Sequence, residues 1–178
     1  MGADKALVPL AGQPLIAWVV ERFAPQVADL VISANGDAAR FGWLGLPVLA
    51  DAVAKGPLSG ILAALQRAAP LGATAVVCVP CDGPFLPPDL VARLCLAAKA
   101  GTPAIATSGA DRHPTCSLWP VTLLPALEAF LASDAVPRVR DFALAHGATF
   151  AAFPPGSFDN ANTAEDLARL SAQLAHKA

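Results

Sequence analysis

A buried strand that ends on a carboxylate constrains the fold of this chain most. Residues 75–79 form an uninterrupted apolar run in which valine predominates. Such a run is typical of a parallel strand that is covered on both faces. Pro80, Gly83 and Pro84 then end the strand and predict a tight loop. Asp82 therefore lies just beyond the carboxyl end of the strand, where open α/β sheets bind their ligands.

Asp82 has two interpretations at this stage. A carboxylate at this edge suits a hard cation such as Mg²⁺ that carries a phosphate. An aspartate before a glycine is also a common turn former, and Asp82 precedes Gly83. The local sequence leaves both interpretations open.

The composition indicates a single compact domain over residues 1–178. Hydrophobic residues make up 55% of the chain and charged residues 15%, which excludes a disordered protein. The formal net charge of −2 provides no field that would gather nucleic acid. No membrane span or signal peptide is recognisable in the sequence. We therefore expect a cytoplasmic protein without nucleic-acid or membrane partners.

The four cysteines do not predict a disulfide framework. Cys78 and Cys81 form a C-x-x-C pair, which raises a redox or zinc interpretation. If the strand runs through Cys81, residues three apart point to opposite faces and cannot chelate together. Cys95 and Cys116 stand alone. We expect all four to be buried thiols.

Strand and helix patterns alternate along most of the chain. Valine- and alanine-rich runs predict strands at residues 30–34, 48–50, 75–79, 104–107 and 150–153. Helical spacing of apolar residues predicts helices at about 14–24, 59–69, 87–98, 123–131 and 138–146, and from 163 onward. Ser59 and Thr163 are the expected caps of two of these helices. The alternation predicts a doubly wound, Rossmann-like α/β domain with three layers and a mostly parallel sheet.

Three polar residues follow three of the predicted strands. Asn35 follows residues 30–34, Asp51 follows residues 48–50, and Asp82 follows residues 75–79. In a parallel sheet all three lie along the carboxyl edge, where crevices form. Each of them alone could be a turn former, but together they favour a ligand site.

A glycine-bearing loop adjoins this edge. Gly56, Pro57, Leu58 and Gly60 form a G-P-L-x-G segment that follows Asp51 and leads into a helix. Such a loop lets the backbone approach a ligand closely, and its N–H groups suit anionic acceptors.

Lys5 is the second informative feature near the N-terminus. It precedes a short apolar segment and the first predicted helix. It is either an exposed surface lysine or a cation beside the metal edge that neutralises triphosphate charge.

These motifs together resemble the bacterial molybdenum cofactor guanylyltransferases (the molybdopterin-guanine dinucleotide biosynthesis protein A family). The resemblance rests on G-x-D-K-A-L at 2–7, L-x-G-x-P-L-I at 10–16, Asn35, Asp51 with G-P-L-x-G, and C-V-P-C-D-G-P-F-L at 78–86. It continues through residues 112–115, 137–140 and 158–167, and so covers essentially the whole chain.

The resemblance implies a fold of the nucleotide-diphospho-sugar transferase type. It also implies transfer of GMP from GTP to molybdenum-bearing molybdopterin with release of diphosphate. Asp82 would bind Mg²⁺ and Lys5 the phosphates, and both would be catalytic. Asn35 and Asp51 would hold the nucleoside, and the loop from Gly56 to Gly60 would border the nucleotide. Molybdoenzymes or other proteins of cofactor biosynthesis are possible partners.

Weaker assignments concern the pterin side of the site. His113 either faces the pterin or is a loop histidine that the backbone satisfies. Asn160 and Asn162 precede a helix whose cap we assign to Thr163 and Asp166, which leaves both asparagines available for pterin or phosphate. Arg138 and Arg140 could meet the substrate phosphate or lie on a helix face, and we favour the asparagines over them.

The chain departs from the family pattern at its start. Members of this family carry a first strand and a glycine-rich phosphate loop before the segment that begins here at Met1. We expect the native protein to include such a segment, because without it backbone groups on both sides of a slot in the sheet stay unpaired. Two alternatives stay open: transfer from CTP, and a non-catalytic protein that binds or docks molybdopterin.

Overall fold

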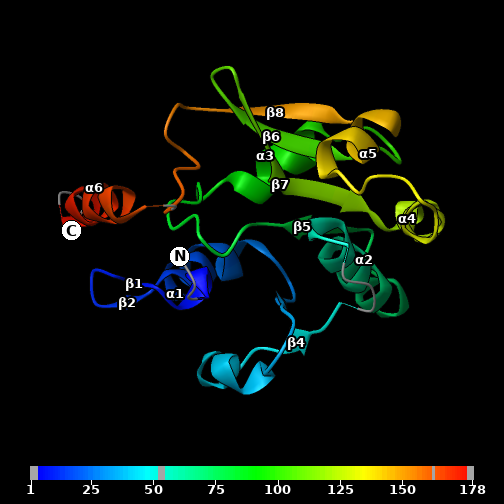
Figure 1. The fold of residues 1–178 in the computed structure, drawn as a ribbon. Helices are drawn as coiled ribbons and strands as arrows, with labels where there is room; N and C mark the ends of the chain where they lie inside the picture. The colour runs from blue at the N-terminus through cyan, green and yellow to red at the C-terminus, as the bar shows by residue number, and fades with distance from the viewer. Residues whose placement is uncertain (1–3, 52–54, 162, 176–178) are drawn as a thin grey trace.

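The computed structural model describes residues 4–51, 55–161 and 163–175 (Figure 1). The strands are Pro9–Leu10 (β1), Gln13–Pro14 (β2), Ile32–Ser33 (β3), Val48–Leu49 (β4), Ala75–Cys78 (β5), Ala104–Ser108 (β6), Asp111–Pro120 (β7) and Thr149–Phe153 (β8). The α-helices are Leu15–Phe23 (α1), Pro57–Ala68 (α2), Leu90–Ala97 (α3), Leu124–Ala132 (α4), Val139–Ala145 (α5) and Ala164–Ala175 (α6). Short 3₁₀ helices are Lys5–Leu7 (η1), Ala24–Gln26 (η2), Ala38–Leu44 (η3), Ala69–Leu71 (η4) and Val121–Leu123 (η5).

The main sheet has the strand order β5-β7-β6-β8. β7 is antiparallel to both of its neighbours, whereas β6 and β8 are parallel. β5, β6 and β8 therefore run in one direction and their carboxyl ends share one edge. β3 and β4 form a separate parallel pair, and β1 with β2 forms an antiparallel hairpin.

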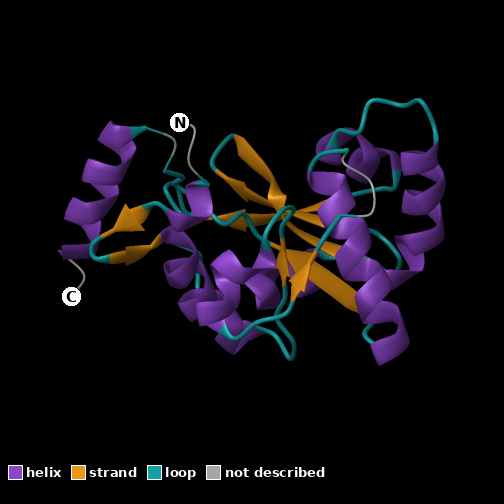
Figure 2. Cartoon of the chain, turned by 60° about the horizontal axis from the view of Figure 1, so that its bottom comes forward, coloured by secondary structure: helices purple, strands orange, loops and turns teal. Residues whose placement is uncertain are grey.

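Helices cover both faces of the main sheet, which confirms the predicted three layers (Figure 2). Alternate residues of each strand point to opposite faces. Val77 and Ala106 pack on the side of α1 and α3, whereas Val76 and Ile105 pack on the side of α2, α4 and α5. A third apolar cluster joins α6 to the β1–β2 hairpin, through residues such as Leu10 and Leu170.

The predicted helices and strands all form, but the structure adds β7, the β1–β2 hairpin and the 3₁₀ helices, which the sequence did not predict. No strand is predicted for residues 111–120, which contain Pro114. The register explains how a proline fits there: the pairing of β7 with β6 passes from Ser117↔Ile105 to His113↔Ala106. Pro114 therefore lies in a bulge, where a strand needs no N–H donor.

The five predicted strands lie in two sheets, β3 and β4 in one and β5, β6 and β8 in the other, instead of the one continuous sheet that the alternation predicts. β3 pairs with β4, and β5 pairs with β7. Among the described residues no strand pairs with the other edge of β3 or with the other edge of β5. α2 contacts β3, β4 and β5, so one helix spans both sheets. Within the described ranges, no helix is long and apolar enough to cross a membrane.

Candidate functional site

Lys5 and Asp82 lie together at the carboxyl edge of the sheet. Asp4 caps the turn that carries Lys5, since its carboxylate accepts a hydrogen bond from the Ala6 N–H at 3.2 Å. Lys5 Nζ lies 3.7 Å from Asp82 Oδ2. The side chain of Lys5 is 41% exposed and that of Asp82 only 16%. The pair therefore joins an accessible cation to a largely sheltered carboxylate.

Asn35 and Asp51 form a second polar pair beyond the ends of β3 and β4. Asn35 Nδ2 donates to Asp51 Oδ2 at 3.0 Å, and the Asp51 N–H donates to Asn35 Oδ1 at 2.9 Å. Ser33 Oγ donates to Asp51 Oδ1 at 3.2 Å. The two reciprocal bonds fix both side chains. Two of the three residues expected along the carboxyl edge therefore meet, whereas Asp82 follows β5 of the other sheet and pairs with Lys5.

The glycine-bearing loop lies beside the Asn35–Asp51 pair. Gly56 has φ 73° and ψ −159°, a conformation that favours glycine, and Pro57 begins α2 directly after it. A Cβ at Gly60 would lie 2.5 Å from Ser33 Oγ and 3.7 Å from Asp51 Oδ1. Glycine at position 60 therefore allows α2 to approach the polar pair closely.

Two details of this loop differ from the sequence prediction. Gly56, not Ser59, is the N-cap of α2, and Ser59 Oγ instead accepts a hydrogen bond from the Lys55 N–H at 3.0 Å. Leu58 is fully buried in the core beside Ile61. Its side chain packs inside the fold, so a nucleotide contact at position 58 would involve the backbone alone.

Asn160 lies against the loop that carries Asp82. The Ala161 N–H donates to the Asp82 carbonyl oxygen at 3.1 Å. A Cβ at Gly83 would lie 3.0 Å from Asn160 Oδ1. Asn162 lies outside the described residues. Thr163 caps α6 as predicted: Asp166 N–H donates to Thr163 Oγ1, and Thr163 N–H donates to Asp166 Oδ2, both at 3.0 Å.

His113 is held by side chains at the same end of the sheet. Its Nε2 is hydrogen-bonded to Ser108 Oγ at 2.7 Å, and its ring packs on Phe158 with centroids 4.6 Å apart. Burial lowers the pKa of His113, an effect that Asp111 and Asp159 oppose. A side-chain partner therefore satisfies this histidine, not the backbone alone.

The remaining candidates are two arginines and the four cysteines. Arg140 pairs with Asp141 next to it in sequence, and the Arg138 N–H donates to the Val136 carbonyl oxygen.

The four cysteines are unbridged, and Cys81 and Cys95 are exposed, which corrects the expectation that all are buried. Burial raises the pKa of Cys78 to about 12. Desolvation, followed by the Asp82 and Asp4 carboxylates, raises the pKa of Cys81 to about 11, so both thiols are protonated at neutral pH.

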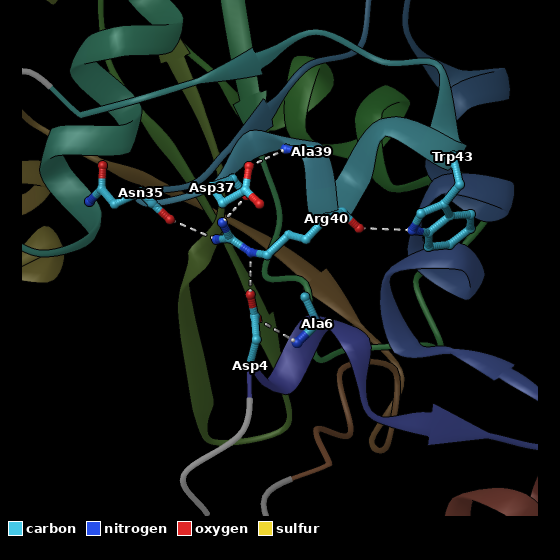
Figure 3. A network of polar contacts seen from close by, with 7 residues as sticks. All are labelled: Asp4, Ala6, Asn35, Asp37, Ala39, Arg40 and Trp43. Carbon is cyan, nitrogen blue, oxygen red and sulfur yellow. Dashed lines mark hydrogen bonds and ion pairs between the residues drawn. The ribbon is translucent and has the colours of Figure 1, made fainter.

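Sequence reasoning missed two residues of this region, Ser33 and Arg40. Ser33 is an ordinary strand residue in the sequence, and only its hydrogen bond to Asp51 distinguishes it. Arg40 contacts Asp4 and the Asn35 backbone (Figure 3). Its position five residues after Asn35 offers no recognisable motif.

Asp82 is the residue of this site that could hold a divalent cation. Among the described residues, no group of three His, Cys, Asp or Glu side chains gathers to form a complete metal cage. Mg²⁺ in nucleotide sites commonly takes one or two carboxylates, with the remaining ligands from water and phosphate. A single sheltered carboxylate beside Lys5 fits that mode of binding.

Comparisons with known proteins identify the family of this chain. Residues 1–148 match the family model described as the MobA-like NTP transferase domain. A molybdenum cofactor guanylyltransferase of Cereibacter sphaeroides is 52% identical over 174 residues, which cover 97% of this chain and 89% of the relative. A molybdenum cofactor guanylyltransferase of Rhodobacter capsulatus is 48% identical over 183 residues, which cover 100% of this chain and 92% of the relative.

Solved structures share the fold at lower sequence identity. The molybdopterin-guanine dinucleotide biosynthesis protein A of Archaeoglobus fulgidus has a TM-score of 0.73 at 23% identity. The match covers 99% of this chain and 93% of the Archaeoglobus chain. A nucleotidyl transferase of Methanothermobacter has a TM-score of 0.76 at 16% identity, with 99% and 87% covered. The chain is therefore a nucleotidyltransferase and belongs to the molybdenum cofactor guanylyltransferase family.

Proposed function

We propose that this protein transfers GMP from GTP to molybdenum-bearing molybdopterin and releases diphosphate. The observation that carries the proposal is the Lys5–Asp82 pair at the carboxyl edge of the sheet. Relatives named molybdenum cofactor guanylyltransferase, at up to 52% identity over nearly the whole chain, support the choice of substrates. We place the reaction in the cytoplasm, where GTP is available.

The reaction is an in-line displacement at the α-phosphorus of GTP. An oxygen of the molybdopterin phosphate forms the new P–O bond, and the bond from the α-phosphorus to the bridging oxygen breaks. Diphosphate leaves with the electron pair of that bond. Lys5 Nζ would neutralise charge on the phosphate oxygens as it develops. No covalent enzyme intermediate is required.

Asp82 would bind Mg²⁺ together with the nucleotide phosphates. The bound ion would supply positive charge that stabilises the transferring phosphoryl group. Asp82 contributes the carboxylate, and the Lys5 ammonium 3.7 Å away lies within reach of the same phosphates. The protein therefore orients the phosphates from two sides, which is a large part of catalysis in phosphoryl transfer.

Asn35 and Asp51 would hold the nucleoside end of GTP. The reciprocal hydrogen bonds between them fix both side chains before the ligand arrives. Gly56, Pro57 and Gly60 would border the nucleotide, with backbone N–H groups at the start of α2 available to polar atoms. His113 and Asn160 would face the pterin, and we assign Asn162 to the pterin from its place in the sequence alone.

We also propose that a further strand and glycine-rich loop complete the sheet between β3 and β5. Each of these strands uses only one edge for pairing within the described residues, and α2 packs on both. Unpaired strand edges are costly and tend to recruit another strand. The coding frame upstream of Met1 should encode an apolar strand followed by glycines. A frame that stops directly before Met1 would contradict this.

Nucleotide choice and catalysis can be tested in one assay. The purified protein is incubated with Mg²⁺, molybdenum-bearing molybdopterin and either GTP or CTP, and diphosphate and dinucleotide products are quantified. We expect diphosphate and the guanine dinucleotide from GTP only. Product from CTP would favour the cytidylyl reaction. Binding of molybdopterin without turnover of either nucleotide would favour a docking protein.

A further inference from the structure

Arg40 connects Asp4, the residue before Lys5, to the backbone of Asn35 (Figure 3). Its Nε donates to Asp4 Oδ2 at 2.8 Å, and its Nη2 donates to the Asn35 carbonyl oxygen at 2.7 Å. Its Nη1 donates to the Asp37 carbonyl oxygen. One guanidinium therefore holds three groups from two separate segments of the chain.

Each segment that Arg40 holds carries a residue of the nucleotide site. Asp4 caps the turn in which Lys5 follows directly, and its second carboxylate oxygen accepts from the Ala6 N–H. The Asn35 backbone that Arg40 binds carries the side chain that is hydrogen-bonded to Asp51. A shift of Arg40 would therefore move the Lys5 turn relative to the Asn35–Asp51 pair.

The guanidinium itself is held in place. It stacks over the Phe41 ring at 4.5 Å from the centroid, and Phe41 is 2% exposed. The Arg40 side chain is 25% exposed. Its charge already has a partner in Asp4, so its role in this arrangement is to fix geometry. A planar fork with donors in fixed directions suits this, whereas a lysine is a point charge that cannot reproduce it.

We propose that Arg40 is a positioning residue that sets the spacing between the phosphate end and the nucleoside end of the GTP site. This inference rests on the proposed function, since it assigns Lys5 to the phosphates and Asn35 with Asp51 to the nucleoside. Misplacement of binding groups by about 1 Å can lower activity on the order of a hundredfold. Loss of Arg40 should therefore weaken GTP binding without unfolding the protein.

Arg93 provides a matched control. Its Nε donates to Asp89 Oδ2 at 2.6 Å, its Nη1 donates to the Ala152 carbonyl oxygen at 3.2 Å, and it lies 5.2 Å from the Phe153 centroid. Arg93 thus makes the same kinds of contact outside the proposed nucleotide site. Arg93→Met measures the structural cost of losing such an arginine.

The experiment compares Arg40→Met, Arg40→Lys and Arg93→Met with the unaltered protein. GTP affinity is measured by calorimetry with Mg²⁺, KM and kcat by steady-state kinetics, and exchange of the Asp51 amide by hydrogen–deuterium exchange without nucleotide. We expect both Arg40 variants to raise the GTP dissociation constant and KM about tenfold or more. We also expect faster exchange at Asp51, whose N–H donates to Asn35. Arg93→Met should change neither.

Three results would overturn the inference. Arg40→Lys with normal GTP affinity would show that charge, not geometry, matters. Arg40→Met with normal affinity would remove Arg40 from the site, and an equal loss in Arg93→Met would make the effect generic. If Arg40→Met does not fold, Asp4→Asn replaces it, because asparagine keeps the cap but loses the ion pair, and normal affinity would again overturn the inference. An unaltered protein that binds no GTP would instead contradict the proposed function, and with it the assignment of Arg40 to a GTP site.

Discussion

Lys5 Nζ lies 3.7 Å from Asp82 Oδ2, although the two residues come from the η1 turn and the loop after β5. The two groups form an ion pair, but their separation exceeds the donor–acceptor distance of a direct N–H···O hydrogen bond, which is about 2.7–3.2 Å. In the proposed mechanism a phosphate oxygen would bind the ammonium while the carboxylate binds a cation. This arrangement suits the proposed roles of Lys5 and Asp82 in binding a metal–triphosphate complex.

Gly60→Ala should destabilise the protein through Ser33. Alanine in a helix is favoured over glycine by about 1 kcal/mol, but its Cβ would lie 2.5 Å from Ser33 Oγ. Such overpacking costs about 1–3 kcal/mol, so we expect a net loss of about 1 kcal/mol in unfolding free energy. Denaturant melts of Gly60→Ala, Ser33→Ala and the double variant measure it. In the Ser33→Ala background the cost should fall, although the Cβ of residue 33 remains 3.3 Å from the new Cβ, and an unchanged cost there would contradict the assigned contact.

His113 should make stability depend on pH. Burial lowers its pKa below the ordinary value of 6.5, so the unfolded chain takes up a proton first as the pH falls. The contribution of neutral His113 to the free energy of unfolding is therefore complete above pH 6.5. It is lost as the pH falls from 6.5 through the lower pKa that His113 has in the folded protein. NMR titration of the His113 ring should give a pKa below 6.5. His113→Phe, which keeps the ring against Phe158, should flatten the fall in melting temperature, and an equally steep fall would assign it to other groups.

Asn160 should affect the molybdopterin side alone. Asn160 lies beside Gly83 and precedes Ala161, whose N–H donates to the Asp82 carbonyl oxygen. We expect Asn160→Ala to raise the KM for molybdopterin about tenfold and to leave the KM for GTP unchanged, as expected for loss of one or two hydrogen bonds. Thr163→Ala is the control: loss of the α6 cap costs about 1 kcal/mol of stability without changing either KM. A raised KM for GTP in Asn160→Ala would place the residue on the nucleotide side.

The local signals in the sequence predicted most of the fold. Apolar runs such as residues 75–79 and helical spacing such as that in α1 are strong periodic patterns, and both elements formed as expected. β7 escaped because its tolerance of Pro114 depends on a bulge that only the pairing with β6 creates. The antiparallel direction of β7 could not be predicted either, because strand direction depends on partner strands far along the chain.

The placement of the candidate site residues was predictable where a residue follows a recognisable strand. Asn35, Asp51 and Asp82 come directly after strand patterns, and the structure joins Asn35 to Asp51 and brings Lys5 to Asp82. Arg40 and Ser33 were not predictable, because their roles depend on contacts with Asp4 and Asp51 that no local pattern encodes. Long-range contacts of polar side chains are thus what sequence reading missed here.

The most direct test of the account is the activity of Asp82→Ala. Diphosphate release from GTP and molybdopterin is followed at several Mg²⁺ concentrations, with circular dichroism as the check on folding. Asp29→Ala, which removes an exposed carboxylate paired with Arg67, serves as the control. We predict that Asp82→Ala folds normally and loses Mg²⁺-dependent turnover by roughly 10³-fold or more, whereas Asp29→Ala stays active. Normal turnover by folded Asp82→Ala would contradict the assignment of Asp82 and with it the proposed mechanism.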